Sequence, residues 1–223
     1  MLIAGLQKNS FVDYPGLPAA VIFTPYCNLN CAYCHNDHIL GPQTPLIDEE
    51  KVIDFLSRRA GMLKALVISG GEPTLQQNLS AFIRQAKTLG YLIKLDTNGT
   101  KPQVLIELIR ERLLDYVAMD VKAPLRSYAQ IARAQVDTAA ILRSVTVLRS
   151  TGIAHEFRLT YAPQLSRSDA VEAARLVKGC ERFYLQQYRV RSAEDPAPHP
   201  PSELQAAAEQ IREEIGVCTL RGL

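Results

Sequence analysis

The sequence predicts an α/β protein built as a partial (β/α)6 barrel. Two observations lead to this fold class: apolar runs alternate with amphipathic stretches along the chain, and six such strand–helix units follow one another. Tandem βα units require parallel strands with right-handed crossovers, as in an open doubly wound sheet or a barrel. Because a closed barrel of this type has eight units, six units favour a partial barrel.

The expected strands are continuous apolar runs, as in strands that are buried on both faces. They cover residues 19–24, 64–69, 91–96, 115–122, 153–161 and 182–188. A short apolar run at 217–220 predicts one further strand near the C-terminus. The strands are therefore spread over nearly the whole chain.

Between these runs, apolar residues recur at helical spacing, and residues that start or stop helices flank them. The expected caps or first-turn residues are Asp48, Pro102, Ser166 or Ser168, and Ser202. Gly90 and Gly216 are expected to end two of the helices. The proline-rich stretch 190–201 is expected to be a loop.

Length and charge suggest one ordinary domain. The 223 residues suit a single domain, with a core at about 19–189 and a C-terminal loop, helix and short strand at 190–223. A formal net charge of +2 indicates neither nucleic acid nor an anionic membrane as partner. No apolar run approaches the roughly 18–20 residues of a membrane span, and Lys8 and Asp13 interrupt the N-terminus. We therefore expect a cytoplasmic protein.

Three of the five cysteines, Cys27, Cys31 and Cys34, lie within eight residues of one another. A tight group in a reducing compartment indicates metal binding rather than a disulfide framework. Three thiolates in one loop can bind three irons of a [4Fe–4S] cube. The fourth iron would then keep an open position for a substrate.

A structural zinc site is the alternative for this cysteine loop, with His35 or His38 as the fourth ligand. Such sites commonly pair two cysteines with a second, distant pair. The remaining cysteines, Cys180 and Cys218, stand alone and are expected to be small buried apolar residues. The spacing alone thus favours iron–sulfur over zinc without excluding zinc.

Further polar residues stand at or just beyond the C-terminal ends of the other five strands. They are Gly70, Gly71, Glu72, Asp96, Thr97, Asn98, Asp120, Lys122, Arg158, Thr160, Gln186, Gln187, Tyr188 and Arg189. Taken singly, each group could be a turn or an internal ion pair. Barrels and open α/β sheets build their sites at this edge, so the shared location predicts one common site.

Through these motifs, the chain resembles the radical S-adenosylmethionine (SAM) superfamily. The resemblance is carried by GLQKNSFVDYPG, CNLNCAYCHN, SGGEPTLQ, LDTNGT, MDVKAP, FRLTYAP and YLQQYR, which span residues 5–189. Within that superfamily it is similar to activating enzymes of glycyl radical enzymes, especially those of anaerobic ribonucleoside-triphosphate reductase. The resemblance implies a partial barrel of the radical SAM type.

The resemblance also implies roles for individual residues. The three cysteines would hold a [4Fe–4S] cluster whose fourth iron binds SAM, and Lys122 would join them as a catalytic residue. Contacts with the cofactor are implied for Tyr33, Gly70, Gly71, Glu72, Asp96, Thr97, Lys122, Arg158 and Arg189. Related activases hold a monovalent cation nearby, at positions that match Asp96, Thr97, Ala118 and Asp120.

The implied activity is reductive cleavage of SAM, followed by removal of a glycine hydrogen from a glycyl radical enzyme. A flavodoxin or ferredoxin would supply the electron. The chain lacks the cysteine-rich insert of some activases, which indicates a single cluster. Two alternatives stay open: a radical SAM enzyme acting on a small molecule, like 7-carboxy-7-deazaguanine synthase, and a non-catalytic domain stabilised by zinc or a cluster.

Overall fold

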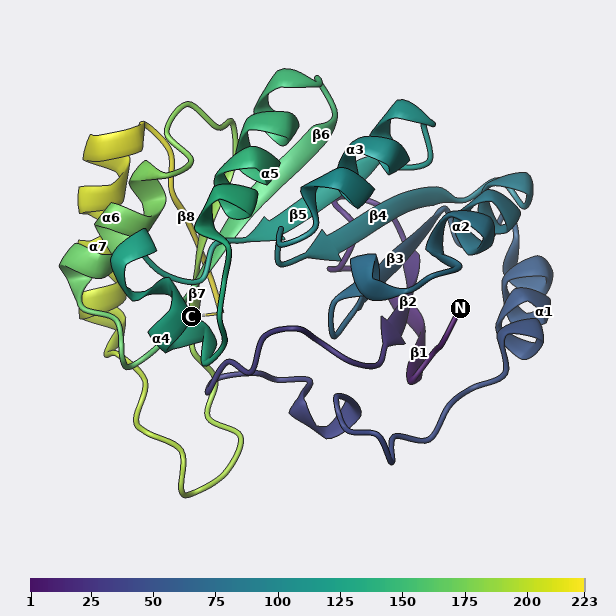
Figure 1. Ribbon diagram of the computed structural model, residues 1–223, viewed down its shortest axis with the longest axis horizontal. Coiled ribbons are helices and arrows are strands. Elements are labelled where there is room, and N and C mark those ends of the chain that lie inside the picture. Colours follow the sequence, from purple (N-terminus) through teal and green to yellow (C-terminus); the bar gives the residue numbers. More distant parts are fainter. Residues whose placement is uncertain (223) are drawn as a thin grey trace.

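The computed structural model describes residues 1–222 and contains one curved, eight-stranded sheet (Figure 1). Strand order follows chain order from β1 to β8. The strands are β1 (Gly5–Ser10), β2 (Ala19–Thr24), β3 (Ala65–Gly70), β4 (Leu92–Thr97), β5 (Tyr116–Asp120), β6 (Ala154–Tyr161), β7 (Phe183–Gln187) and β8 (Thr219–Arg221). Strands β2 to β8 are parallel and β1 is antiparallel to β2. The predicted partial α/β barrel is confirmed.

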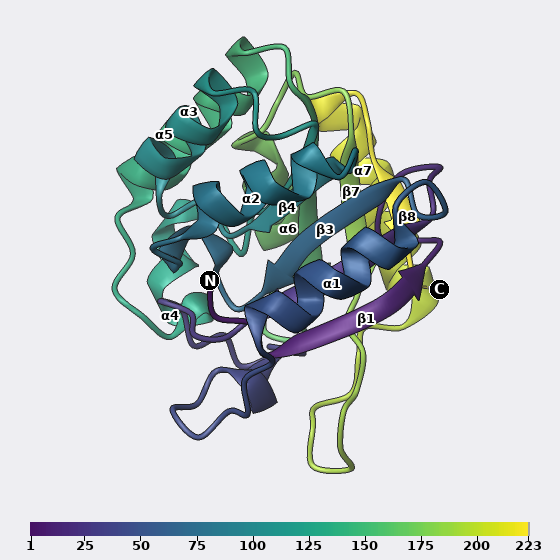
Figure 2. The same cartoon turned by 90° about the vertical axis from the view of Figure 1, so that its right-hand side faces the viewer.

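Helices lie along the outer side of the curved sheet (Figures 1 and 2). The α-helices are α1 (Glu49–Arg59), α2 (Leu79–Thr88), α3 (Pro102–Arg110), α4 (Tyr128–Ala132), α5 (Thr138–Ser150), α6 (Arg167–Arg175) and α7 (Pro201–Ile215). The short 3-10 helices are η1 (Asp37–Ile39), η2 (Pro73–Leu75) and η3 (Leu125–Ser127). As expected, Asp48 caps α1 by accepting a hydrogen bond from the Glu50 amide, and Ser166 caps α6. Pro102 begins α3, and Gly216 ends α7 in a left-handed conformation.

The parallel register decides which polar side chains meet inside the sheet. Asp96 on β4 lies beside Ala118 on β5, and Asp120 lies beside Arg158 on β6. Side chains two apart on a strand share a face, so Lys94 and Asp96 point to the same side. The register therefore brings carboxylates of two strands towards the arginine of a third.

One strand was not predicted and one expected helix cap was wrong. Strand β1 was not predicted, because its residues, GLQKNS, show neither an apolar run nor a clear alternation. Helix α7 begins at Pro201 with Pro200 as N-cap, so Ser202 is not the cap. Proline fits the first helical turn because its fixed φ is helical and its missing N–H has no helical partner there.

The last predicted strand is present as β8, shifted to Thr219–Arg221, and it adds a seventh parallel strand to the six expected. The stretch 190–200 is irregular, as expected. Cys180 and Cys218 are buried at 7% and 6% exposure, which agrees with their expected role as small apolar residues.

Within residues 1–222, none of the helices combines the length and apolar character that a membrane crossing requires.

Candidate active site

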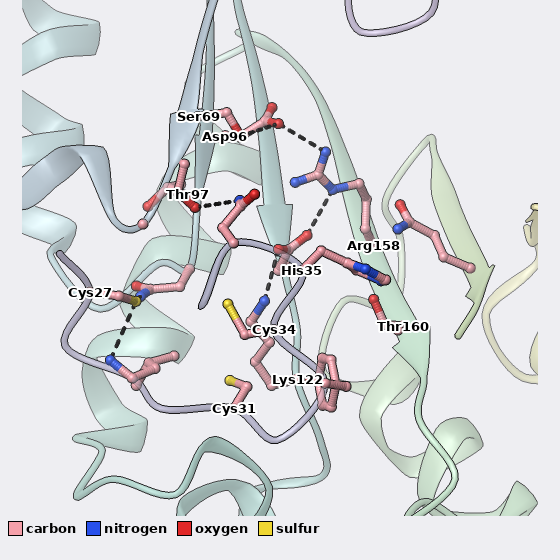
Figure 3. A pocket seen from close by; sticks show the side chains of 18 of the residues that line it. Cys27, Cys31, Cys34, His35, Ser69, Asp96, Thr97, Lys122, Arg158 and Thr160 are labelled. Atoms are coloured by element: carbon pink, nitrogen blue, oxygen red, sulfur yellow. Dashed lines mark hydrogen bonds and ion pairs between the residues drawn. The ribbon is translucent and has the colours of Figure 1, made fainter. Parts of the chain in front are cut away.

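The polar residues that follow the strands meet around one cavity of about 370 Å³ (Figure 3). Its lining includes most of the residues singled out from the sequence: Cys27, Cys31, Tyr33, Cys34, Gly70, Gly71, Asp96, Thr97, Asp120, Lys122 and Arg158. In Figure 3 the three cysteines lie towards one end of the cavity and Asp96 lies at the other. One site therefore spans the ends of β2 to β7.

The cysteine loop, residues 27–36, presents three free thiols to this cavity. Burial raises the pKa of Cys27 to about 11 and also raises the pKa of Cys31. Both thiols are therefore protonated at neutral pH and would release their protons on binding a metal. Backbone bonds shape the loop: Cys34 N donates to Cys31 O at 3.1 Å, and Leu29 N donates to Cys27 Sγ at 3.4 Å. Among residues 1–222, no three His, Cys, Asp or Glu side chains are grouped to hold a single metal ion.

Gly70 ends β3 and Gly71 follows it, and both pack against the segment that leads from β2 into the cysteine loop. A Cβ on Gly71 would lie 1.9 Å from Tyr26 O, and one on Gly70 would lie 2.4 Å from Thr24 N. Gly70 also has a φ of +111°, which favours glycine. Because side chains are excluded here, the backbone of this turn can approach both the cysteine loop and the cavity.

Glu72 is fully buried but does not line the cavity. Its carboxylate accepts hydrogen bonds from Asn98 N at 2.7 Å, Thr97 Oγ1 at 2.8 Å and Thr74 N at 3.1 Å. Burial raises the pKa of Glu72, although these donors oppose the increase. The carboxylate thus ties the turn after β3 to the turn after β4, rather than facing the cavity as the resemblance implies.

Five charged side chains form a continuous series inside the barrel, which we call the charge ladder: Lys94, Asp96, Arg158, Asp120 and Lys122. Arg158 stands at its centre, with Nε 2.7 Å from Asp120 Oδ1 and a terminal nitrogen 3.2 Å from Asp96 Oδ2 (Figure 3). Lys94 pairs with Asp96 at 2.7 Å, and Lys122 pairs with Asp120 at 2.9 Å. Positive and negative groups therefore alternate along the ladder.

The ladder fixes the protonation of its members. Burial would by itself raise the pKa of Asp96, but Arg158 and Lys94 outweigh it and hold this pKa below its usual value. Asp120 is affected in the same way by Arg158 and Lys122. Burial would lower the pKa of Lys122 and Arg158, yet the carboxylates raise both. Asp96, Asp120, Lys122 and Arg158 are therefore charged at neutral pH.

This pairing does not fit the monovalent cation site that the resemblance implies. Arg158 and the two lysines already neutralise Asp96 and Asp120. The Thr97 hydroxyl donates to Glu72, and Ala118 is buried outside the cavity lining. Three of the four groups expected around a cation are thus engaged with protein partners, and the fourth, Ala118, does not line the cavity.

Tyr33 and Arg189, both expected to contact the cofactor, lie in different environments. Tyr33 lines the cavity at 4% exposure, and its hydroxyl has no hydrogen-bond partner within the described residues. Arg189 is exposed and lies outside the cavity lining, whereas Gln186 of the same C-terminal motif lines it. The structure therefore does not place Arg189 at the site, because it follows the end of β7 and leaves the sheet edge.

The structure adds Asp13, which the sequence reasoning missed as a site residue. It lies in the loop between β1 and β2, accepts a hydrogen bond from Ser10 Oγ at 2.5 Å, and lines the cavity. In the sequence, Asp13 was marked only by its place in GLQKNSFVDYPG, one of the stretches that carry the family resemblance. Without a predicted β1, nothing indicated that this stretch returns to the site.

Comparison with known proteins decides the family. Residues 21–177 match the model of the radical SAM superfamily. The chain belongs to the radical SAM superfamily. This family implies a [4Fe–4S] cluster and SAM as the bound groups, and three free thiols beside a cavity suit such a cluster because cysteine thiolate is its usual ligand.

Individual relatives of this radical SAM protein differ in how much of the chain they match. A protein of Methanocaldococcus jannaschii, provisionally named a glycyl-radical enzyme activating enzyme, is 37% identical over 87% of this chain and 82% of its own length. The 7-carboxy-7-deazaguanine synthase of Neisseria meningitidis is 32% identical over 48% of this chain and 45% of its own. The SAM-bound structure of Streptococcus suis SuiB is 14% identical, covers 88% of this chain and 48% of its own, and has a TM-score of 0.71. This last likeness bears on the fold alone.

Proposed function

We propose that this protein activates a glycyl radical enzyme, and that its partner is an anaerobic ribonucleotide reductase. The observation that carries the activase proposal is the 37% identity to the M. jannaschii protein over most of both chains. A partial match could report only the shared cofactor site, but this one extends over the strands and loops around that site. The reductase as partner rests on the resemblance in the sequence motifs.

The cysteine loop supplies the ligands for the iron–sulfur cluster. We assign Cys27, Cys31 and Cys34 to three irons, since all three thiols are free and face the cavity. When bound, the reduced cluster and SAM supply a 5′-deoxyadenosyl radical that can remove hydrogen from a glycine Cα. The protein contributes binding and orientation to such chemistry.

Groups around the cavity suit the polar parts of SAM. The backbone of Gly70 and Gly71 can approach the methionyl amine closely because no side chain intervenes. Tyr33 offers a buried hydroxyl without a partner, which suits a hydrogen bond to the adenosyl end. Lys122 is kept protonated by Asp120 and suits the methionyl carboxylate.

The charge ladder keeps the cavity rigid and holds its protons in place. Hydrogen abstraction by a radical needs no general acid or base, and the shifted pKa values of Asp96, Asp120, Lys122 and Arg158 keep these four groups from titrating near neutral pH. The ladder's function in this proposal is to orient Lys122 and Arg158 towards the cavity.

We propose a flavodoxin or ferredoxin as electron donor, since clusters in proteins reach strongly negative potentials.

A small-molecule substrate, as in 7-carboxy-7-deazaguanine synthase, is the second candidate. The observation in its favour is 32% identity to the Neisseria enzyme. That match covers less than half of this chain, against 87% for the M. jannaschii protein. The activase is therefore the better supported of the two.

An anaerobic assay with both partners tests the proposal. The reconstituted protein, a chemical reductant, SAM and an anaerobic ribonucleotide reductase are mixed, and the electron paramagnetic resonance (EPR) spectrum is recorded. We expect a glycyl radical signal that disappears when the radical-site glycine of the reductase is changed to alanine. SAM cleavage without any signal would exclude this partner, and turnover of a 7-deazaguanine precursor would favour the second candidate.

A further inference from the structure

The loop 190–200, which links β7 to α7, lies against the cysteine loop. Figures 1 and 2 both show these two segments at the same end of the barrel. They are more than 150 positions apart in the chain, and hydrogen bonds join them. Neither the cavity lining nor the proposed cofactor contacts involve this loop, so its contacts call for another explanation.

Arg191 makes the contacts between the two loops. Its guanidinium donates to Cys34 O and to the Asp37 carboxylate through one nitrogen, and to Ala32 O at 3.3 Å through another. Its side chain is 27% exposed. A guanidinium presents several donors in a fixed plane, so one side chain can hold three acceptors of a turn at once.

The loop is held by contacts within it and by contacts at its C-terminal end. Within the loop, Asp195 accepts a hydrogen bond from Arg191 N at 2.7 Å and pairs with the Arg191 guanidinium at 3.4 Å. Near its end, the His199 ring stacks on Tyr161 with centroids 3.9 Å apart, and His199 O accepts from Gln187 Nε2 at 2.8 Å. These contacts orient Arg191 within the loop and attach the end of the loop to β6 and β7.

We infer that Arg191 is a positioning residue that fixes the cysteine loop in the shape that presents its thiols, and that it sets a positive charge beside the cluster. This inference rests on the proposed function, since Cys34 must be a cluster ligand. Hydrogen bonds and charges around a cluster tune its reduction potential and hold its ligands in place. Arg191 bonds the carbonyl of Cys34 itself, so it acts through that ligand rather than on SAM.

Three variants separate geometry from charge. Arg191→Ala removes both, and Arg191→Lys keeps the charge but lacks the planar donors that reach three acceptors. Arg175→Ala is the matched control, because Arg175 pairs with Glu214 on the outer helices and is exposed. All three retain the cysteines.

The first test uses the cluster-free protein and hydrogen exchange of backbone amides. In Arg191→Ala we expect exchange within residues 28–40 to be at least about ten-fold faster, because three hydrogen bonds are lost and the loss of one charge-assisted bond alone would account for such a change. Arg191→Lys should lie between this variant and the wild type, and Arg175→Ala should match the wild type. Equal exchange in Arg191→Ala and the wild type overturns the inference, whatever the protein's reaction.

The second test uses the reconstituted protein and an EPR-monitored redox titration. We expect Arg191→Ala to shift the midpoint potential of the cluster to more negative values and to release iron faster to a chelator. Arg191→Lys should keep the potential near that of the wild type while also releasing iron faster. An unchanged potential and iron release in Arg191→Ala contradict the role of Arg191, whereas failure of the wild type to cleave SAM contradicts the proposed function instead.

Discussion

The cysteine loop and four of the five residues of the charge ladder line the same cavity, but the two regions differ in how their polar groups are paired. The loop leaves its three thiols free and places the partnerless Tyr33 hydroxyl nearby. The ladder gives each of its five charges an opposite charge within 3.2 Å. One wall is thus open for a ligand, and the other is closed by the protein's own residues.

The difference follows from what burial costs each kind of group. A neutral thiol loses little on leaving water, so the loop can keep its thiols without charged partners until metal binds. A buried carboxylate or ammonium group is costly unless it is paired, so the ladder charges are matched in the folded chain. Changes in the loop should therefore remove function, while changes in the ladder should first remove stability.

The largest effect is expected from Cys31→Ala. Loss of one thiolate leaves the cluster with two protein ligands, so bound iron should fall from about four per chain to near none, and SAM cleavage should stop. Iron analysis and assay of 5′-deoxyadenosine measure both. Cys180→Ala, which removes a buried thiol outside the cavity, is the control and should retain both. If Cys31→Ala keeps a full cluster, the ligand assignment is wrong.

Arg158→Met should destabilise the fold by about 3 kcal/mol, because Asp96 and Asp120 lose their shared partner and keep only one lysine each. Denaturant unfolding of the cluster-free protein measures this change. Arg126→Ala breaks an exposed ion pair with Asp169 and should cost at most about 1 kcal/mol. Equal losses in the two variants would show that the ladder gives no special stabilisation.

Acid should weaken the ladder with a defined sign. The folded-state pKa of Asp96 lies below its ordinary value of 3.8 because Arg158 and Lys94 outweigh burial. The unfolded chain therefore binds more protons, and stability falls as pH drops through 3.8 towards the depressed folded value. We expect the difference in the free energy of unfolding between the wild type and Arg158→Met to decrease as the pH falls through this range, which denaturant unfolding at a series of pH values measures. A constant gap would contradict the charge assignment of the ladder.

Glu72→Gln should have a smaller effect, about 1–3 kcal/mol of lost stability, because the new amide NH2 would face either Asn98 N or Thr97 Oγ1, which are both hydrogen-bond donors to Glu72. Thermal unfolding of the cluster-free protein checks this. Glu50→Gln on the exposed face of α1 is the matched control and should change stability by less than about 0.5 kcal/mol. If Glu72→Gln leaves the stability unchanged, Glu72 does not tie the two turns together.

The sequence predicted the β2–β7 core well because buried parallel strands are long apolar runs. Cys27, Cys31, Cys34, Gly70 and Gly71 were found for a related reason, since all stand directly after such runs. The location of a residue after a strand does not tell whether its side chain reaches the cavity. Glu72 and Arg189 both follow strands, yet one is bound by neighbouring donors and the other is exposed.

Long-range partners were out of reach of the sequence. The pairing of Arg158 with two carboxylates depends on the register of β4, β5 and β6, which no local pattern encodes. The same holds for Asp13, which returns to the site only through β1, and for Arg191, whose partners lie in the cysteine loop. The start of helix α7 was predicted wrongly for a local reason: Ser202 and Pro201 both suit a helix start, and the helix begins at Pro201.

Transfer of a labelled hydrogen is the most direct test of the central claim. An anaerobic ribonucleotide reductase whose glycines carry deuterium at Cα is mixed with the reconstituted protein, SAM and a reductant, and the 5′-deoxyadenosine formed is analysed by mass spectrometry. The proposed function predicts one deuterium in this product, with loss of the label when the radical-site glycine is replaced by alanine. 5′-Deoxyadenosine that forms in the presence of the reductase but carries no deuterium would contradict it.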